Sequence, residues 1–230
     1  MKIAIIPARA GSKRIPKKNI KFFFGKPMIY WSIRAAKKTK LFDKIIVSTD
    51  NKKIAKIAKK YKAEVPFLRP AKISGDKTPV SKAVTHTLMW LKNKGFKPQD
   101  VCCIFATAAF IRSSDIKKGF TKLKKNKWNY VFSATNFPYP IFRSFQKKKR
   151  GELKMVFKKN YFGKNTQYFS DTYHDAGQFY WGKASTWLKS KPIFSKSSTI
   201  INIPRWRAHD IDTLEDWEIA LKIGKAINKF

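Results

Sequence analysis

The sequence is poor in cysteine and in acidic residues, and it lacks long apolar runs. Its only two cysteines, Cys102 and Cys103, are neighbours in an apolar segment, where they cannot comfortably bond to each other. We therefore expect two reduced, buried thiols, as in a cytoplasmic protein. No apolar run reaches the roughly 18 residues that a transmembrane helix needs, so we expect no membrane span. These features favour a cytoplasmic globular protein.

Acidic residues number only 14 against 51 lysines and arginines, which gives a formal net charge of +37. A balance this basic can indicate a nucleic-acid partner. Here the excess is mostly lysine and is spread along the chain in runs such as KKTK (37–40) and KKIAKIAKK (52–60). We interpret it as a general residue bias that attracts anionic small molecules. A nucleic-acid-binding protein remains a distant alternative.

Short β-rich runs alternate with helical patterns in the first half of the chain. Ile54, Ile57, Ala58 and Tyr61, for example, recur at the spacing of one helix face. Such alternation is typical of an α/β fold with a mostly parallel sheet and helices on both faces. Strands are expected over residues 2–7, 44–50, 64–67, 101–107 and 130–135, and helices over 27–38, 51–61, 79–94 and 114–125.

The pattern changes after Pro138. Residues 141–157 predict two strands around the basic turn Lys147–Gly151, which is an antiparallel hairpin. A further strand is expected over residues 177–182. Because the sequence shows neither an internal repeat nor a linker, we expect the hairpin to be an insertion in one domain that spans residues 1–230.

The loop IPARAGSKRIPKKN (6–19) follows the first expected strand and combines five basic residues with one glycine. Ligands of open parallel sheets bind at the carboxyl ends of the strands. Gly11 would let the backbone approach a phosphate closely, and Ser12 with the nearby lysines could surround a polyphosphate. The spacing matches neither a Walker loop nor G-x-G-x-x-G. A solvated basic loop is the alternative to a phosphate site.

Two of the scarce acidic residues, Asp210 and Asp212, lie two positions apart just before a predicted final helix. In extended backbone such side chains share a face, so both carboxylates could hold one hard cation such as Mg²⁺. The alternative is helix-start chemistry, because acidic residues are favoured near a helix N-terminus. Thr213 and Asp216 form a capping-box-like pattern there.

The segment YHDAGQFYWG (173–182) is the third candidate site. His174, Asp175 and Gln178 lie at the mouth of an aromatic strand, where they could hold a polar ligand by hydrogen bonds. The alternative is a turn into a core strand, with its polar residues chosen for the backbone.

These stretches occur together in one family. IPARAGSKRIPKKN resembles the signature A-R-x-G-S-K-x-x-x-x-K-N of the sialic acid cytidylyltransferases, which activate nine-carbon 2-keto sugar acids with CTP. IIVSTD (45–50), LRPA (68–71) and DIDT (210–213) follow in the order of that family. YHDAGQFYWG and PRWRAHDIDTLEDW (204–217) look most like the branch that acts on pseudaminic acid.

The resemblance implies a Rossmann-like nucleotide-diphospho-sugar transferase fold and a homodimer. It also implies a Mg²⁺-dependent reaction of CTP with pseudaminic acid, which gives a CMP-sugar and pyrophosphate. N-acetylneuraminate, legionaminate and other 2-keto sugar acids are alternative acceptors. The inserted region, residues 138–180, would contribute to the dimer and close over the sugar site.

Site residues follow from the same resemblance, position by position. The nucleotide would contact Arg9, Gly11, Ser12, Lys13, Lys18, Asn19, Arg69 and Thr107. The sugar would contact His174, Asp175 and Gln178. Asp210 and Asp212 would bind the metal and, with Lys18, form the catalytic set.

Overall fold

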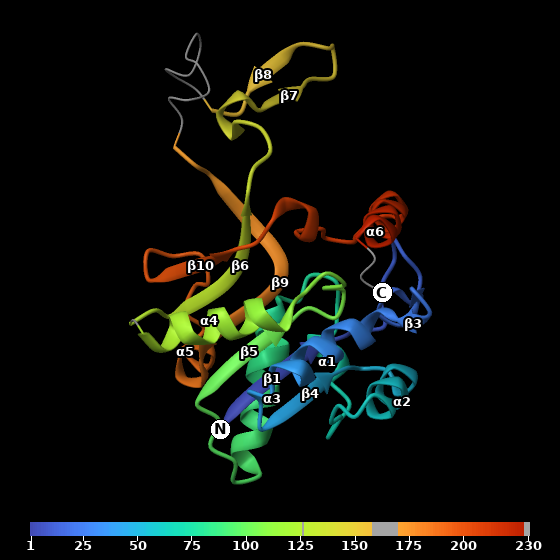
Figure 1. Ribbon diagram of the computed structural model, residues 1–230, viewed down its shortest axis with the longest axis vertical. Helices are drawn as coiled ribbons and strands as arrows, with labels where there is room; N and C mark the ends of the chain where they lie inside the picture. The colour runs from blue at the N-terminus through green and yellow to red at the C-terminus, as the bar shows by residue number, and fades with distance from the viewer. Residues whose placement is uncertain (126, 158–169, 228–230) are drawn as a thin grey trace.

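A six-stranded sheet forms the centre of the computed structural model, which describes residues 1–125, 127–157 and 170–227 (Figure 1). The strand order is β10-β6-β9-β5-β1-β4, and only the two pairings that β9 makes, with β5 and β6, are antiparallel among these described strands. The mostly parallel α/β sheet predicted from the sequence is therefore confirmed. The strands are β1 (Lys2–Pro7), β4 (Lys44–Ser48), β5 (Asp100–Ile104), β6 (Tyr130–Asn136), β9 (Tyr173–Lys183) and β10 (Ser198–Asn202).

Helices cover both faces of the sheet because its strands are apolar on both sides. In β1, Ala4 and Ile6 face one buried cluster while Ile3 and Ile5 face the other. The first cluster includes residues of α1 (Met28–Thr39), α2 (Lys52–Lys60) and α4 (Ser113–Lys125), and the second includes residues of α3 (Val80–Asn93) and α5 (Ala184–Leu188).

The two cysteines divide between the same two clusters. Cys102 packs with the first and Cys103 with the second, and both are buried free thiols, as predicted. Burial raises the pKa of both thiols, so neither is a nucleophile in the folded protein.

A third buried cluster packs residues near the start of the chain against residues near its end. It packs α6 (Leu214–Ala226) against β2 (Phe22–Phe23), with Ile15 and Ile211 buried in the same group. The ring centroids of Phe23 and Trp217 lie 5.4 Å apart in an edge-on contact. Figure 1 shows α6 beside β3 (Lys26–Pro27). This packing brings the late acidic segment next to the first loop.

The predicted hairpin is present as an arm that projects from the sheet (Figure 1). It pairs β7 (Phe145–Lys147) with β8 (Leu153–Met155) in antiparallel register. Gly151 has a φ of +95° at the turn, a conformation that favours glycine. Part of the predicted inserted region, residues 158–169, lies outside the described residues.

Other elements differ from the prediction. The expected strand over 64–67 is wrong: only single bridges form there, Ile46 with Glu64 and Thr49 with Leu68. Pro66 has no N–H to donate to a ladder, which explains the interruption. Strand β9 extends beyond the predicted 177–182, and β10, α5 and the β2–β3 pair were not predicted. Short 3₁₀ helices are η1 (Lys18–Ile20), η2 (Ala71–Ile73), η3 (Ile141–Arg143) and η5 (Arg205–Arg207).

In the part of the chain that the structure describes, every helix is too short or too polar to cross a lipid bilayer.

Candidate active site

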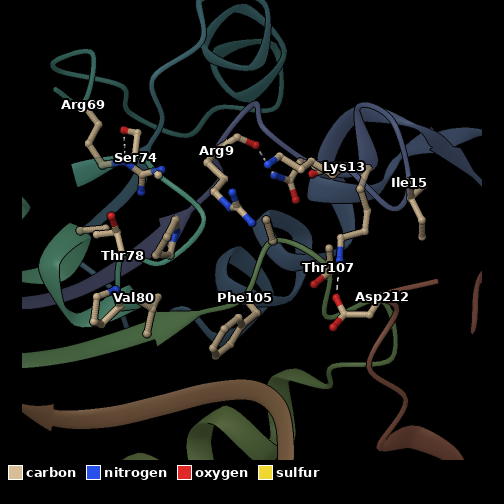
Figure 2. A pocket seen from close by; sticks show the side chains of 18 of the residues that line it. Arg9, Lys13, Ile15, Arg69, Ser74, Thr78, Val80, Phe105, Thr107 and Asp212 are labelled. Carbon is tan, nitrogen blue, oxygen red and sulfur yellow. Dashed lines mark hydrogen bonds and ion pairs between the residues drawn. The ribbon is translucent and has the colours of Figure 1, made fainter. Parts of the chain in front are cut away.

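A cavity of about 240 Å³ opens where β1 and β5 end. Its walls come from the loop after β1, the segment between Arg69 and Ala83, the turn Phe105–Thr107 after β5, and Asp212. Figure 2 shows Arg69, Ser74, Thr78 and Val80 on one side of it and Thr107 with Asp212 on the other. This is the edge of the sheet at which an open α/β fold binds its ligand.

Four cations of the first loop line this cavity and are divided between two carboxylates, Asp212 in the lining and Asp76 outside it. Asp76 pairs with the Arg9 guanidinium and, through its other oxygen, with Lys13 Nζ at 2.8 Å. Asp212 accepts from Arg14 Nη2 at 2.6 Å and from Lys18 Nζ at 2.9 Å, the two cations again using different oxygens. Hydrogen bonds from Lys13 and Arg9 lower the pKa of Asp76 to about 2. The basic loop and the late acidic segment therefore meet, as the sequence predicted.

Lys18 is the least exposed of these cations, with 15% of its side chain accessible. Its ammonium also donates to the carbonyl of Ile211 at 2.5 Å. Partial burial would raise the pKa of Asp212, but the hydrogen bond from Lys18 and the charges of Lys18 and Arg14 outweigh it, and the pKa is lowered. Asp212 is thus a carboxylate whose charge is well compensated.

Asp210 has a different environment. Partial desolvation, together with the negative charge of Asp212, raises its pKa, although the nearby charge of Lys18 opposes the shift. It lies against Gly177 of β9, where φ is +59° and an added Cβ would come 3.7 Å from Asp210 Cγ. Among the described residues no cation forms an ion pair with Asp210.

The negative charge of Asp210, which Lys18 offsets only in part, makes the carboxylate pair a fitting site for a hard cation. Asp210 and Asp212 supply oxygen donors, which Mg²⁺ prefers. The residues described contain no group of three acidic, histidine or cysteine side chains able to hold a metal. A cation at this pair would consequently need further oxygens from water, from backbone carbonyls or from a substrate.

The shape of the first loop is fixed by hydrogen bonds to its backbone. Asn19 is buried and donates from Nδ2 to the carbonyl of Arg9 at 2.9 Å, and Ala10 N donates to Asp50 Oδ1 at 2.9 Å. Gly11 is not among the lining residues, and a Cβ there would make only an ordinary contact, 3.6 Å from Arg9 Nη1. The other residues predicted for the nucleotide all line the cavity: Arg9, Ser12, Lys13, Lys18, Asn19, Arg69 and Thr107.

The far end of the cavity is built around Arg69. This side chain is buried, and its Nε donates to Ser74 Oγ at 3.0 Å. Burial lowers the pKa of Arg69. Ser74, Thr78 and Phe105 also line this cavity and were not predicted.

The residues predicted for the sugar lie on β9, outside the lining of the cavity. Asp175 accepts from the Tyr180 hydroxyl and from Gly177 N, the latter at 3.0 Å. Gln178 is buried, and its Nε2 donates to the carbonyl of Arg207 at 2.5 Å. Its Oε1 is buried without a hydrogen-bond partner in the portion of the chain described here. Through Gly177 and Arg207 these residues adjoin the acidic segment rather than the basic loop.

Asp76 and Arg14 are the charged residues that were not assigned to the site from the sequence. Arg14 falls at a variable position of the loop signature. Asp76 lies in the turn SGDK (74–77), where an aspartate is usually explained by turn chemistry. The scarcity of acidic residues was the one signal that could have singled it out.

Comparison with known proteins agrees with this geometry. Residues 3–203 match the family model described as Cytidylyltransferase. The pseudaminic acid cytidylyltransferase of Campylobacter jejuni is 38% identical over 218 residues, which are 95% of this chain and 94% of that protein. The CMP-N,N'-diacetyllegionaminic acid synthase of Legionella pneumophila is 44% identical over 99 residues, 43% of this chain and 40% of that protein.

A solved structure shows the same fold. It is titled as CMP:2-keto-3-deoxy-manno-octonic acid synthetase complexed with CTP, and it superposes with a TM-score of 0.70 at 12% identity. The match covers 98% of this chain and 99% of that one. The Rossmann-like nucleotidyltransferase fold expected from the sequence is thereby confirmed. On the strength of the family match and the sequence identity along nearly its whole length, this chain belongs to the cytidylyltransferase family.

Proposed function

We propose that this enzyme transfers CMP from CTP to the anomeric hydroxyl of a nine-carbon 2-keto sugar acid, with pseudaminic acid as the first candidate. The observation that carries the proposal is the convergence of Arg9, Lys13, Arg14 and Lys18 with Asp212 in one cavity at the sheet edge. The choice of sugar rests on the Campylobacter relative, whose name states that activity.

In this reaction the sugar oxygen forms a bond to the α-phosphorus of CTP, and the bond from that phosphorus to the β-phosphate oxygen breaks. Pyrophosphate leaves, so negative charge builds up on the departing group. Arg9, Lys13 and Lys18 would bind the triphosphate and stabilise that charge. Arg69 and Ser74, at the other end of the cavity, would hold the ribose or base. Thr107 would contact the nucleotide between them.

Asp210 and Asp212 would hold Mg²⁺, which when bound neutralises phosphate charge and lowers the pKa of a coordinated hydroxyl. Two neighbouring side chains control how readily Asp212 can bind a metal. Lys18 and Arg14 already neutralise this carboxylate, so they compete with any metal for it. Asp210 has no such competitor among the described cations and would be the stronger metal ligand.

His174, Asp175 and Gln178 would bind the sugar. Support comes from the unpartnered Oε1 of Gln178 and from Gly177, which places this strand against Asp210. The inserted region, residues 138–180, would contribute to a homodimer through its projecting β7–β8 arm and close over the sugar site. We assign the reaction to the cytoplasm, where two free thiols would stay reduced.

A pyrophosphate-release assay with CTP, Mg²⁺ and a panel of sugar acids tests the proposal. We expect release with pseudaminic acid and little or none with CTP alone. Release with legionaminate or N-acetylneuraminate instead would keep the reaction and change the acceptor. No release with any sugar acid, from folded protein, would refute the proposed function.

A further inference from the structure

The carboxylate of Asp76 pairs with two of the three cations that the proposed function assigns to the triphosphate. Asp76 lies in the loop between η2 and α3, and its two oxygens pair separately with Arg9 and Lys13. Asp76 engages only Nη1 of Arg9, so donors remain on both cations, but its negative charge opposes a phosphate that approaches the same two groups. Binding of an anion at this end of the cavity must therefore work against the charge of Asp76.

The two acidic residues at the cavity differ in how firmly they are held. Asp212 N donates to Asp216 Oδ2 at 3.0 Å, inside the capping box of α6, and Asp212 pairs with the poorly exposed Lys18. Asp76 instead pairs with the largely exposed Lys13, in a loop that contains Gly75. Exposed ion pairs are weak and are screened by salt. Asp76 is the carboxylate that a strong anion can displace.

We propose that Asp76 is an internal counter-anion that lowers the affinity of the cavity for free phosphates, so that firm binding requires the additional nucleoside contacts of CTP. Its ion pairs with Arg9 and Lys13 oppose binding of any anion, whether inorganic phosphate, pyrophosphate or a nucleotide. A nucleotide offsets this opposition through its ribose and base, which reach Ser74, Thr78 and Arg69. Pyrophosphate makes no such contacts. After the reaction, Asp76 returns to the two cations as pyrophosphate departs.

The loop itself links the two ends of the cavity. Ser74 and Thr78 line the nucleoside end, while Asp76 between them pairs with Arg9 and Lys13, which line the phosphate end. Thr78 N donates to the carbonyl of Gly75 at 3.1 Å, so these residues form one turn. Contacts of a nucleoside with Ser74 or Thr78 would consequently act on the same turn that carries Asp76. This inference rests on the proposed placement of the triphosphate.

The test is calorimetric titration of pyrophosphate into the protein without divalent metal, at low ionic strength. We expect Asp76→Asn to bind pyrophosphate about three- to tenfold more tightly than the unsubstituted protein. Glu64→Gln is the matched control, since it also removes one negative charge and one exposed ion pair, with Lys44 at 2.9 Å, away from the cavity. The affinity of Glu64→Gln for pyrophosphate should stay within about twofold of that of the unsubstituted protein.

The outcomes separate this inference from the proposed function. Equal or weaker binding by Asp76→Asn overturns the role of Asp76 and leaves the triphosphate site in place. Failure of both proteins to bind pyrophosphate overturns both ideas. In a background that carries Arg9→Ala and Lys13→Ala, Asp76→Asn should lose its effect. If Asp76→Asn still raised the affinity for pyrophosphate by the same factor in that background, the inference would also be overturned. The charge of Asp76 would then not act through Arg9 and Lys13.

Discussion

Lys18 Nζ and the Asp212 carboxylate lie 2.9 Å apart although 194 positions separate the two residues in the chain. Packing of Ile15 with Ile211 in one buried cluster brings their segments together. A cation assigned to phosphate and a carboxylate assigned to metal are therefore direct neighbours. Substitutions at the two positions should impair the reaction in distinguishable ways.

Replacing Lys18 with alanine should chiefly weaken the use of CTP. A charged hydrogen bond contributes about 1.5–3 kcal/mol, so we expect the KM for CTP to rise by about tenfold or more. Steady-state kinetics with CTP as the varied substrate measure this. Lys17→Ala, at the exposed neighbouring position, is the control. An unchanged KM in Lys18→Ala would show that the triphosphate is bound elsewhere.

Replacing Asp210 with asparagine should abolish turnover and leave the fold intact. The change keeps the shape of the side chain but removes a negative charge that forms no ion pair among the described residues. Binding of Mn²⁺ in the presence of CTP should fall together with activity, while the melting temperature should not. Glu218→Gln, an exposed acid on α6, should change neither quantity. Near-normal turnover by Asp210→Asn would refute the metal role.

The buried ion pair of Asp115 and Arg207 should be important for stability. Both side chains are less than 10% exposed, and Arg207 Nε has no hydrogen-bond partner within the described structure. Asp115→Ala would leave a buried guanidinium without its counter-ion, which costs about 3–5 kcal/mol of unfolding free energy. Chemical denaturation measures the loss. Adding Arg207→Met should restore much of it, and a double variant as unstable as Asp115→Ala would contradict this reading.

Local patterns in the sequence were sufficient for much of the fold. Helix α2, which carries lysines on its exposed face, could be predicted from the spacing of its apolar residues. The start of α6 could be predicted from the pattern of Thr213 and Asp216. The antiparallel insertion of β9 between β5 and β6 was not predictable in this way. A buried strand is apolar on both faces whichever way it runs, so its direction leaves no clear trace in the pattern.

The candidate site, like the fold, could be predicted only in part from local sequence patterns. The loop signature and the pair Asp210 and Asp212 were visible because each is a compact motif. The role of Asp76 depends on contacts with Arg9 and Lys13, more than 60 positions earlier, that only the folded chain creates. The hydrogen bond from Gln178 to the Arg207 carbonyl is likewise a long-range contact. The sequence does not reveal this partner, so a polar residue in an aromatic strand allowed two interpretations.

The exposed apolar residues of the arm give a test of the proposed homodimer. Phe145 and Leu153 are 58% and 63% exposed, on the antiparallel strands β7 and β8. Burying large apolar side chains is a main source of stability in protein interfaces. Replacing both with lysine should therefore raise the dimer dissociation constant by about tenfold or more. Sedimentation velocity over a range of concentrations measures this constant.

Phe22→Lys supplies the control for the arm. Phe22 is 69% exposed but lies on β2, beside α6 and far along the chain from the hairpin. One added positive charge at that position, against two in the arm variant, should leave self-association unchanged. If the arm variant stays as dimeric as the unsubstituted protein, the arm is not the contact between copies. If Phe22→Lys is the variant that dissociates, the interface lies on the α6 side, and the proposed role of the arm in the homodimer is refuted.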